Sequence, residues 1–316
     1  MKSQYEAHKE LIISLSKRGL SSSEISDVLG MKTPDKKFPP RSIRKALQRW
    51  GHGSARTEPA KILLFDIESS PMITYSWQAK TRYITPEKVI SDWFVICWSA
   101  KWLFNDNIIS QSVTAKEAIN KDDKRIVTKL WALLDEADIV IAHNGDNFDI
   151  RKMNTRFAKY KLNLPSPYQT IDTYKSARKR LNISYYRLSY LADYFGLDHS
   201  KHSTDFQMWV DCLNGDDEAL QNMQDYCDQD IRVLEDVYLY LRPFIQPHPN
   251  LGLYIEEDSS MCPSCASTDL KKCGTYATTV NLYESYRCNK CGSITRARKS
   301  ALHKEDKEFI TSSVPR

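Results

Sequence analysis

The segment KILLFDIES, residues 61–69, decides how the rest of the chain is interpreted. Its four apolar residues followed by an alternating pattern predict a buried β-strand. Successive side chains of a strand point to opposite faces, so Asp66 and Glu68 share one face and Ile67 lies on the other. Two neighbouring carboxylates repel each other unless a cation lies between them. The segment therefore favours a divalent metal site, although a D-x-E pair taken alone is more simply a solvated surface pair.

A second acidic position follows in ADIVIAHNGDNFD, residues 137–149. Residues 139–142 predict another short buried strand, and Asp149 leads into a helix predicted over residues 150–161. Active-site residues of open α/β sheets gather at such junctions between a strand and a helix. Taken alone, Asp149 would be an acid that interacts with the positive end of a helix dipole.

A third position lies in a helix predicted over residues 216–240, which contains the sequence YCDQD at residues 226–230. Tyr226 and Asp230 are four residues apart and share one helical face. The apolar residues at 231, 234 and 237 are expected to pack this helix on the sheet. Asp225 and Asp228 point elsewhere and are expected to be solvated.

Together, and in this order, the patterns D-x-E, N-x3-F-D and Y-x3-D resemble the DEDD family of 3′-5′ exonucleases. The match is to the tyrosine-containing branch, which includes the proofreading domains of B-family DNA polymerases. The resemblance covers roughly residues 61–244, with support from IDTY at 171–174 and from residues 188–197. It implies an α/β, RNase H-like fold in which helices flank a mixed sheet.

The resemblance also implies a role for each acidic position. Asp66 would bridge two metal ions, Glu68 and Asp230 would complete the first site, and Asp149 would hold the second ion. Tyr226 would orient the attacking water. Because the candidate ligands are all hard oxygens, two Mg2+ or Mn2+ ions are the expected cofactors. The implied reaction is phosphodiester hydrolysis at a 3′ end of DNA with release of 5′-nucleotides.

Cysteine spacing predicts a separate metal centre near the end of the chain. Two C-x2-C pairs, Cys262/Cys265 and Cys288/Cys291, are separated by 22 residues. This is the spacing of a zinc ribbon, in which four thiolates hold one structural Zn2+. Residues 278–287 are expected to form hairpin strand between the pairs, and Cys273 is expected to be a spare outside the cluster.

The first fifty residues predict a small helical domain. Helices are expected over residues 8–17, 22–29 and 41–50, the last with a basic face. Two helices, a loop and a basic third helix resemble a helix-turn-helix DNA-binding unit. A three-helix cap packed on the main domain explains the same pattern equally well.

Charge is distributed unevenly along the chain. Residues 1–58 hold 12 basic and 6 acidic side chains, residues 59–257 hold 23 and 28, and residues 258–316 hold 10 and 6. Basic ends around an acidic middle suggest arms that bind a polyanion and a core that binds metal. The candidate nucleic-acid contacts are Asn144, Arg41, Arg44, Lys45, Arg49, Arg296 and Arg298.

Aromatic residues are frequent between positions 71 and 101. Some of them could stack on nucleobases, but most are more simply explained as core. They include Tyr75, Trp77, Tyr83, Trp93 and Trp98, and Trp102 follows directly.

These patterns divide the chain into a helical domain at 1–55, an exonuclease domain at 60–250, a zinc ribbon at 258–300 and a basic, flexible tail at 301–316. The charged start and the lack of long apolar runs favour a cytoplasmic protein with no membrane partner. DNA is the expected partner and a monomer the expected state. Two alternative functions fit the same residues. One is an exoribonuclease with the same active site, and the other is a DNA-binding accessory protein with a non-catalytic nuclease fold.

Overall fold

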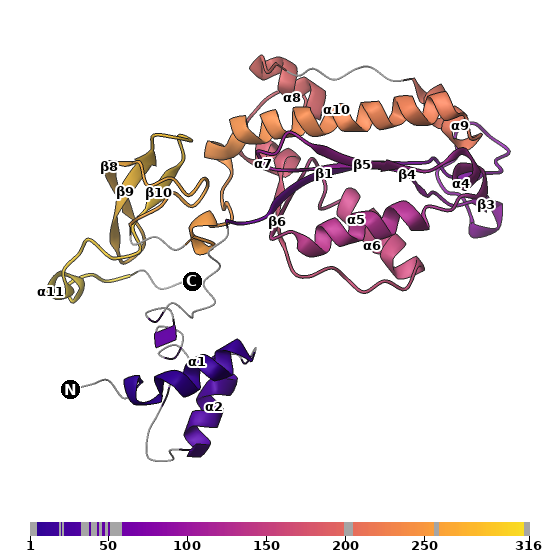
Figure 1. The fold of residues 1–316 in the computed structure, drawn as a ribbon. Coiled ribbons are helices and arrows are strands. Elements are labelled where there is room, and N and C mark those ends of the chain that lie inside the picture. Colours follow the sequence, from indigo (N-terminus) through magenta and orange to yellow (C-terminus); the bar gives the residue numbers. More distant parts are fainter. Residues whose placement is uncertain are drawn as a thin grey trace. The chain divides into compact units, whose positions relative to one another are not determined.

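The structure is a computed structural model that describes residues 5–18, 20, 22–32, 38, 43, 46–47, 50, 59–198, 205–255 and 259–312 (Figure 1). The chain forms two compact units. One contains residues 1–59 and 253–258, and the other contains residues 60–252 and 259–316.

The N-terminal unit contains a short 3-10 helix, η1 (Glu6–His8), followed by α1 (Lys9–Lys17) and α2 (Ser22–Lys32). These agree with the first two predicted helices. Their apolar faces meet in a small core that also takes in Phe38, Ile43 and Leu47. The basic side chains predicted for a third helix lie outside the described residues: Arg41, Arg44, Lys45 and Arg49.

The larger unit is built on a five-stranded mixed sheet in the order β5-β4-β1-β6-β7. Its strands are β1 (Ile62–Ser69), β4 (Val95–Trp102), β5 (Ile108–Ser112), β6 (Ile139–Ala142) and β7 (Gln169–Asp172). The central strand β1 runs antiparallel to β4 and parallel to β6, and β7 continues the parallel half. The α/β architecture with a mixed sheet agrees with the predicted RNase H-like fold.

Helices cover both faces of this sheet (Figure 1). The long helix α10 (Asp217–Leu241) packs along β4 and β1, and α5 (Lys124–Glu136) with α6 (Asp149–Lys159) lies on the opposite face. The remaining helices are α4 (Ala115–Asn120), α7 (Thr173–Arg180), α8 (Leu188–Phe195), α9 (Phe206–Leu213) and α11 (Lys304–Lys307), with 3-10 turns η2 (Pro86–Lys88), η3 (Arg242–Phe244) and η4 (Leu251–Leu253). None of the helices in the described ranges has the length and apolar character needed to cross a membrane.

Alternation along β1 sorts its side chains between the two faces. Leu63, Phe65 and Ile67 are buried in the main core, and Asp66 and Glu68 are only partly buried. Because α10 covers the face that carries these two acids, the strand presents them to a helix that brings further polar side chains.

The aromatic residues between positions 71 and 102 divide into two groups. Trp98 is buried, where its indole donates a hydrogen bond of 2.8 Å to the Ile126 carbonyl, and Trp93 and Trp102 pack against the same core. The other three are exposed in and beside the short hairpin of β2 (Ile73–Thr74) and β3 (Val89–Ser91): Tyr75 at 72%, Trp77 at 96% and Tyr83 at 72%. Packing in the core therefore explains only three of these six aromatic residues.

A separate three-stranded sheet in the order β10-β9-β8 carries the C-terminal cysteines. It contains β8 (Leu270–Ala277), β9 (Leu282–Cys288) and β10 (Ile294–Arg296). The strand predicted to begin at residue 278 begins at residue 282 instead. Residues 278–281 form the turn, in which the Thr278 amide donates to the Asn281 carbonyl at 2.8 Å.

Candidate active site

Three carboxylates meet where β1 faces α10. Asp66, Glu68 and Asp230 each offer one oxygen, and these atoms lie within 4.8 Å of one another. Asp66 and Glu68 are partly buried, and Asp230 is only 4% exposed. Such a set of hard oxygen donors fits Mg2+ or Mn2+, because a divalent cation relieves the repulsion among three anions at this separation.

Asp149 lines the same cleft but lies outside this group of three. It is the first residue of α6 and is 2% exposed. One of its carboxylate oxygens accepts a hydrogen bond of 3.3 Å from the backbone amide of Ile67, between the two acids of β1. The site thus consists of a cluster of three acids with a fourth, buried acid held beside it.

The turn that carries Asp149 into the cleft has little room for side chains. Asn144 has a φ of 65°, and its backbone amide donates to a carboxylate oxygen of Asp172 at 3.0 Å. Next in sequence, Gly145 has no space for a side chain, because a Cβ atom there would lie 2.3 Å from the Cβ of Ala142. This close approach lets the end of β6 turn directly into α6.

We expect Gly145→Ala to destabilise the fold by about 1–3 kcal/mol, since a methyl group must displace the end of β6. Removing the opposing methyl group should restore part of this loss, so the double variant Gly145→Ala/Ala142→Gly should be more stable than Gly145→Ala alone. Urea unfolding of the variants measures both effects. A Gly145→Ala protein as stable as the wild type would contradict this close packing.

Burial raises the pKa of Asp149 to about 7, and the neighbouring Asp172 carboxylate adds to the rise. Hydrogen bonds from the backbone amides of Asp149 and Ile67 act in the opposite direction. Because metal binding requires the ionised carboxylate, binding at this position competes with a proton near neutral pH.

The raised pKa of Asp149 predicts a pH dependence of stability in chelator-treated protein. The folded state keeps this proton up to about pH 7, whereas the unfolded chain releases it near the ordinary value of 3.8. The stabilisation from this group is therefore complete below that lower value and is lost as the pH rises towards 7. We expect Asp149→Asn to remove this loss, measured as the difference in urea unfolding free energy between wild type and variant across this range. A difference that stays constant with pH would contradict the assignment.

Tyr226 reaches the cleft from the same face of α10 as Asp230, one turn earlier. Its ring makes an edge contact with Trp209 of α9, with the ring centroids 6.3 Å apart. The next residue of the helix, Cys227, is buried, and its sulfur lies 3.7 Å from a carboxylate oxygen of Asp66. The helix is thus packed closely against β1 at the level of the acids.

Asp228 is held within the fold, which corrects the expectation that it is solvated. It is partly buried and accepts hydrogen bonds from the side chains of Ser99, Gln224 and Ser110. These bonds join α10 to β4 and β5, so the carboxylate stabilises the helix on the sheet. Asp225 is exposed, as expected, and bonds to Gln221 on the same helix.

The acids open into a cleft of about 770 Å3. Several lining residues were not predicted from the sequence as functional: His143, Tyr174, Arg187, Leu188, Ser189 and Asp193. Most of them come from α7, α8 and the segment between these helices. No spacing pattern marks them, because the folded chain alone brings this segment to the edge of the cleft.

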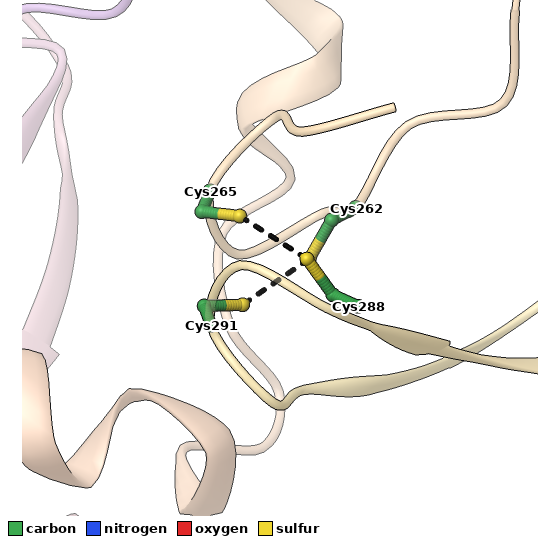
Figure 2. Close-up of side chains that lie close together, drawn as sticks. All are labelled: Cys262, Cys265, Cys288 and Cys291. Carbon is green, nitrogen blue, oxygen red and sulfur yellow. Dashed lines mark hydrogen bonds between the residues drawn. The ribbon is translucent and has the colours of Figure 1, made fainter. Parts of the chain in front are cut away.

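The four cysteines of the C-x2-C pairs form a second cluster (Figure 2). Their sulfur atoms lie within 4.8 Å of one another, with 3.6 Å between Cys262 and Cys291 and between Cys265 and Cys288. Cys273 is exposed on β8, outside the cluster, as predicted.

Four thiols this close cannot all ionise without a cation. Burial raises the pKa of Cys262 to about 11 and raises that of Cys265 further. Burial also acts to raise the pKa of Cys291, but hydrogen bonds from Ser293 and the neighbouring thiols outweigh it and lower the value to about 7. A set of four thiolates fits Zn2+, whose charge would lower the pKa of all four thiols.

Arg296 and Arg298, predicted as nucleic-acid contacts, are both exposed on or just after β10. The Arg296 guanidinium lies over the ring of Tyr283, 4.1 Å from its centroid, and 5.9 Å from that of Tyr276. These contacts hold the cation on the surface of the small sheet.

A family model agrees with this fold. Residues 100–242 match the family described as the RNase_H superfamily; this range includes Asp149, Tyr226 and Asp230. The chain is similar to DNA polymerase III PolC-type of Ureaplasma parvum, with 30% identity over 111 residues that cover 34% of this chain and 8% of that protein. A family B DNA polymerase of the archaeon Pyrobaculum calidifontis matches with a TM-score of 0.45 and 16% identity, over 59% of this chain and 25% of that structure. The larger unit therefore has an RNase H-like fold, and residues 100–242 within it match the RNase_H superfamily.

Proposed function

We propose that this chain is a metal-dependent 3′-5′ exonuclease of the tyrosine-containing DEDD type, acting on single-stranded DNA or DNA 3′ ends. The observation that carries the proposal is the convergence of Asp66, Glu68 and Asp230 within 4.8 Å, in one cleft with Asp149 and Tyr226. These five positions are the ones that the three sequence patterns selected.

In this proposal each residue has a defined task. Asp66, Glu68 and Asp230 would hold one divalent ion, and Asp66 with Asp149 would hold a second. Two such ions, when bound, stabilise charge on the attacking and leaving oxygens of an in-line phosphoryl displacement. The Tyr226 hydroxyl orients the water that attacks phosphorus, and Asp149 must first release its proton.

Cleavage of labelled oligonucleotides tests the proposal. DNA and RNA strands labelled at the 5′ or the 3′ end are incubated with Mg2+, with Mn2+ or with chelator. An exonuclease of this polarity shortens 5′-labelled strands stepwise and releases the label of 3′-labelled strands as a mononucleotide. Faster digestion of RNA would favour the exoribonuclease alternative. Binding without cleavage under every condition would favour an accessory protein.

We expect Tyr226→Phe to lower the cleavage rate by about tenfold to a hundredfold, less than the loss of an acid, because only the orientation of water is affected. The ring, and with it the contact to Trp209, is retained. Single-turnover rates with saturating enzyme measure the effect. An unchanged cleavage rate would show that the Tyr226 hydroxyl has no catalytic role, and the roles proposed for the acids would be unaffected.

A further inference from the structure

We propose that a row of tyrosines on and beside α8 stacks on unpaired bases of the strand whose 3′ end enters the cleft. The row consists of Tyr185, Tyr190 and Tyr194, and we call it the aromatic row. This inference rests on the proposed function, since it names the residues that would contact the bases of the single strand proposed as substrate.

The members of the row contact each other in sequence. The rings of Tyr185 and Tyr190 meet edge to face with centroids 5.3 Å apart, and those of Tyr190 and Tyr194 lie nearly parallel at 6.1 Å. Beyond Tyr194, Phe195 continues the series and stacks on Tyr240 of α10 at 4.3 Å. The row is therefore a continuous strip of rings that extends from the segment before α8 to α10.

Residues next to the row in sequence line the cleft that holds the acids. Leu188, Ser189 and Asp193 of α8 line this cleft. A step of one residue along a helix rotates the side chain by about 100°. Tyr190 and Tyr194 each follow a cleft-lining residue, so their side chains lie about 100° further around the helix than Ser189 and Asp193, where a strand that leaves the cleft over α8 would meet them.

The two outer rings of the row are more exposed than packing would require. Tyr185 is 62% exposed and Tyr194 is 59% exposed, while Leu191 and Ala192 on the inner face of α8 are buried. Tyr190, which joins the two outer rings, is partly buried. Single exposed aromatic residues are ordinary, but two exposed rings joined through a third indicate a binding surface. Aromatic rings in contact with solvent are the groups on which unpaired bases stack, whatever their sequence.

Positive charge lies where the backbone of such a strand would run. Arg187, the residue before α8, lines the cleft and is exposed, and no hydrogen bond or ion pair in the described part of the chain holds its guanidinium. The last turn of α7 adds three cations immediately before this segment: Arg178, Lys179 and Arg180. Because the catalytic acids repel a polyanion, neighbouring cations are needed to hold a strand with its end among them.

The segment that presents the row is fixed to the sheet. The ring nitrogens of His143, at the end of β6, lie 2.9 Å from the Thr173 hydroxyl and 2.8 Å from the Tyr186 carbonyl. The Tyr186 hydroxyl in turn donates to the Leu181 carbonyl at 2.9 Å. These bonds fix Tyr186, the residue between Tyr185 and Arg187, to the end of β6 and to the residue that follows α7.

Binding to strands with and without bases tests the inference. The full chain carrying Asp66→Ala, which blocks cleavage, is titrated against 5′-fluorescein-labelled oligodeoxythymidine of about ten nucleotides, within the range of single-strand site sizes. A strand of equal length with abasic sites provides the same phosphates without bases. Fluorescence anisotropy gives both dissociation constants.

The pair Tyr185→Ala/Tyr194→Ala should weaken binding of the thymidine strand by at least about fivefold and leave the abasic strand almost unchanged, because only a strand with bases can stack on the rings. Tyr185→Leu/Tyr194→Leu keeps apolar packing on α8 and should give the same result, which separates stacking from local unfolding. Phe206→Ala, an exposed aromatic change on α9, is the control and should have no effect.

Equal losses for both strands, or no loss for either, would overturn the inference, as would equal competition by a blunt duplex. The test is independent of catalysis. If the wild-type chain fails to cleave any strand but the row variants lose base-dependent binding, the exonuclease proposal fails and the aromatic row remains a single-strand site.

Discussion

Asp66→Ala is expected to reduce metal-dependent cleavage about a thousandfold or more, the largest effect of any single change at the candidate site. Asp66 is proposed to contact both metal ions, and its carboxylate lies within 4.8 Å of those of Glu68 and Asp230. Metal ions contribute several kcal/mol to the stabilisation of transition-state charge, and each 1.36 kcal/mol corresponds to a factor of ten in rate. Single-turnover cleavage of a labelled strand in Mg2+ and in Mn2+ measures the loss.

Two comparisons make this result specific. Asp230→Ala should behave in the same way, because Asp230 provides the part of the cluster that comes from α10. Asp225→Asn should keep the wild-type rate, since this acid is exposed on the same helix and bonds only to Gln221 in the described residues. Wild-type rates for Asp66→Ala would refute the proposed function.

Loss of folding is not expected to explain the effect of Asp66→Ala. Without metal, Asp66, Glu68 and Asp230 repel one another, so removal of one charge should leave the apoprotein at least as stable as the wild type. Urea unfolding in chelator tests this point. In Mg2+ the order should reverse, because only the wild type gains stability from bound metal.

Cys262→Ser is expected to abolish zinc binding and to unfold residues 259–312 locally. The buried residues in the described part of this region are few: Cys262, Ser264, Ser285, Cys288 and Ser293. Binding of a structural zinc ion contributes about 10–16 kcal/mol in domains of this size, far more than so small a core can supply. The zinc content of the purified protein and limited proteolysis measure the loss.

Cys273→Ser is the matched control, because Cys273 is an exposed cysteine on β8 outside the cluster. It should keep one zinc ion per chain and the wild-type pattern of proteolysis. If Cys262→Ser also retained zinc and resisted proteolysis, the four cysteines would not form a structural centre. In either outcome the RNase H-like domain should keep its own unfolding transition.

The strongest sequence signals were local ones. Alternation in residues 61–69 was sufficient to place Asp66 and Glu68 on one face of a strand, and helical spacing was sufficient to pair Tyr226 with Asp230. The two C-x2-C pairs likewise predicted a cluster that the structure contains. The first two predictions depend on a repeat of the backbone itself, two residues in a strand or three to four in a helix, which no distant part of the chain can alter. The cysteine prediction depends instead on the ligand spacing that a tetrahedral zinc site requires.

The sequence by itself determined the type of each element and the acids they carry: a strand with Asp66 and Glu68, a turn with Asp149, and a helix with Tyr226 and Asp230. Only the tertiary structure decided which other residues surround them. Asp228 is held by Ser99 and Ser110 from β4 and β5, three exposed aromatic residues lie near the β2–β3 hairpin, and Phe195 of α8 stacks on Tyr240 of α10. The physical reason is that solvation and contact depend on strands and helices packed from distant parts of the chain, whereas spacing along one element records only its own geometry.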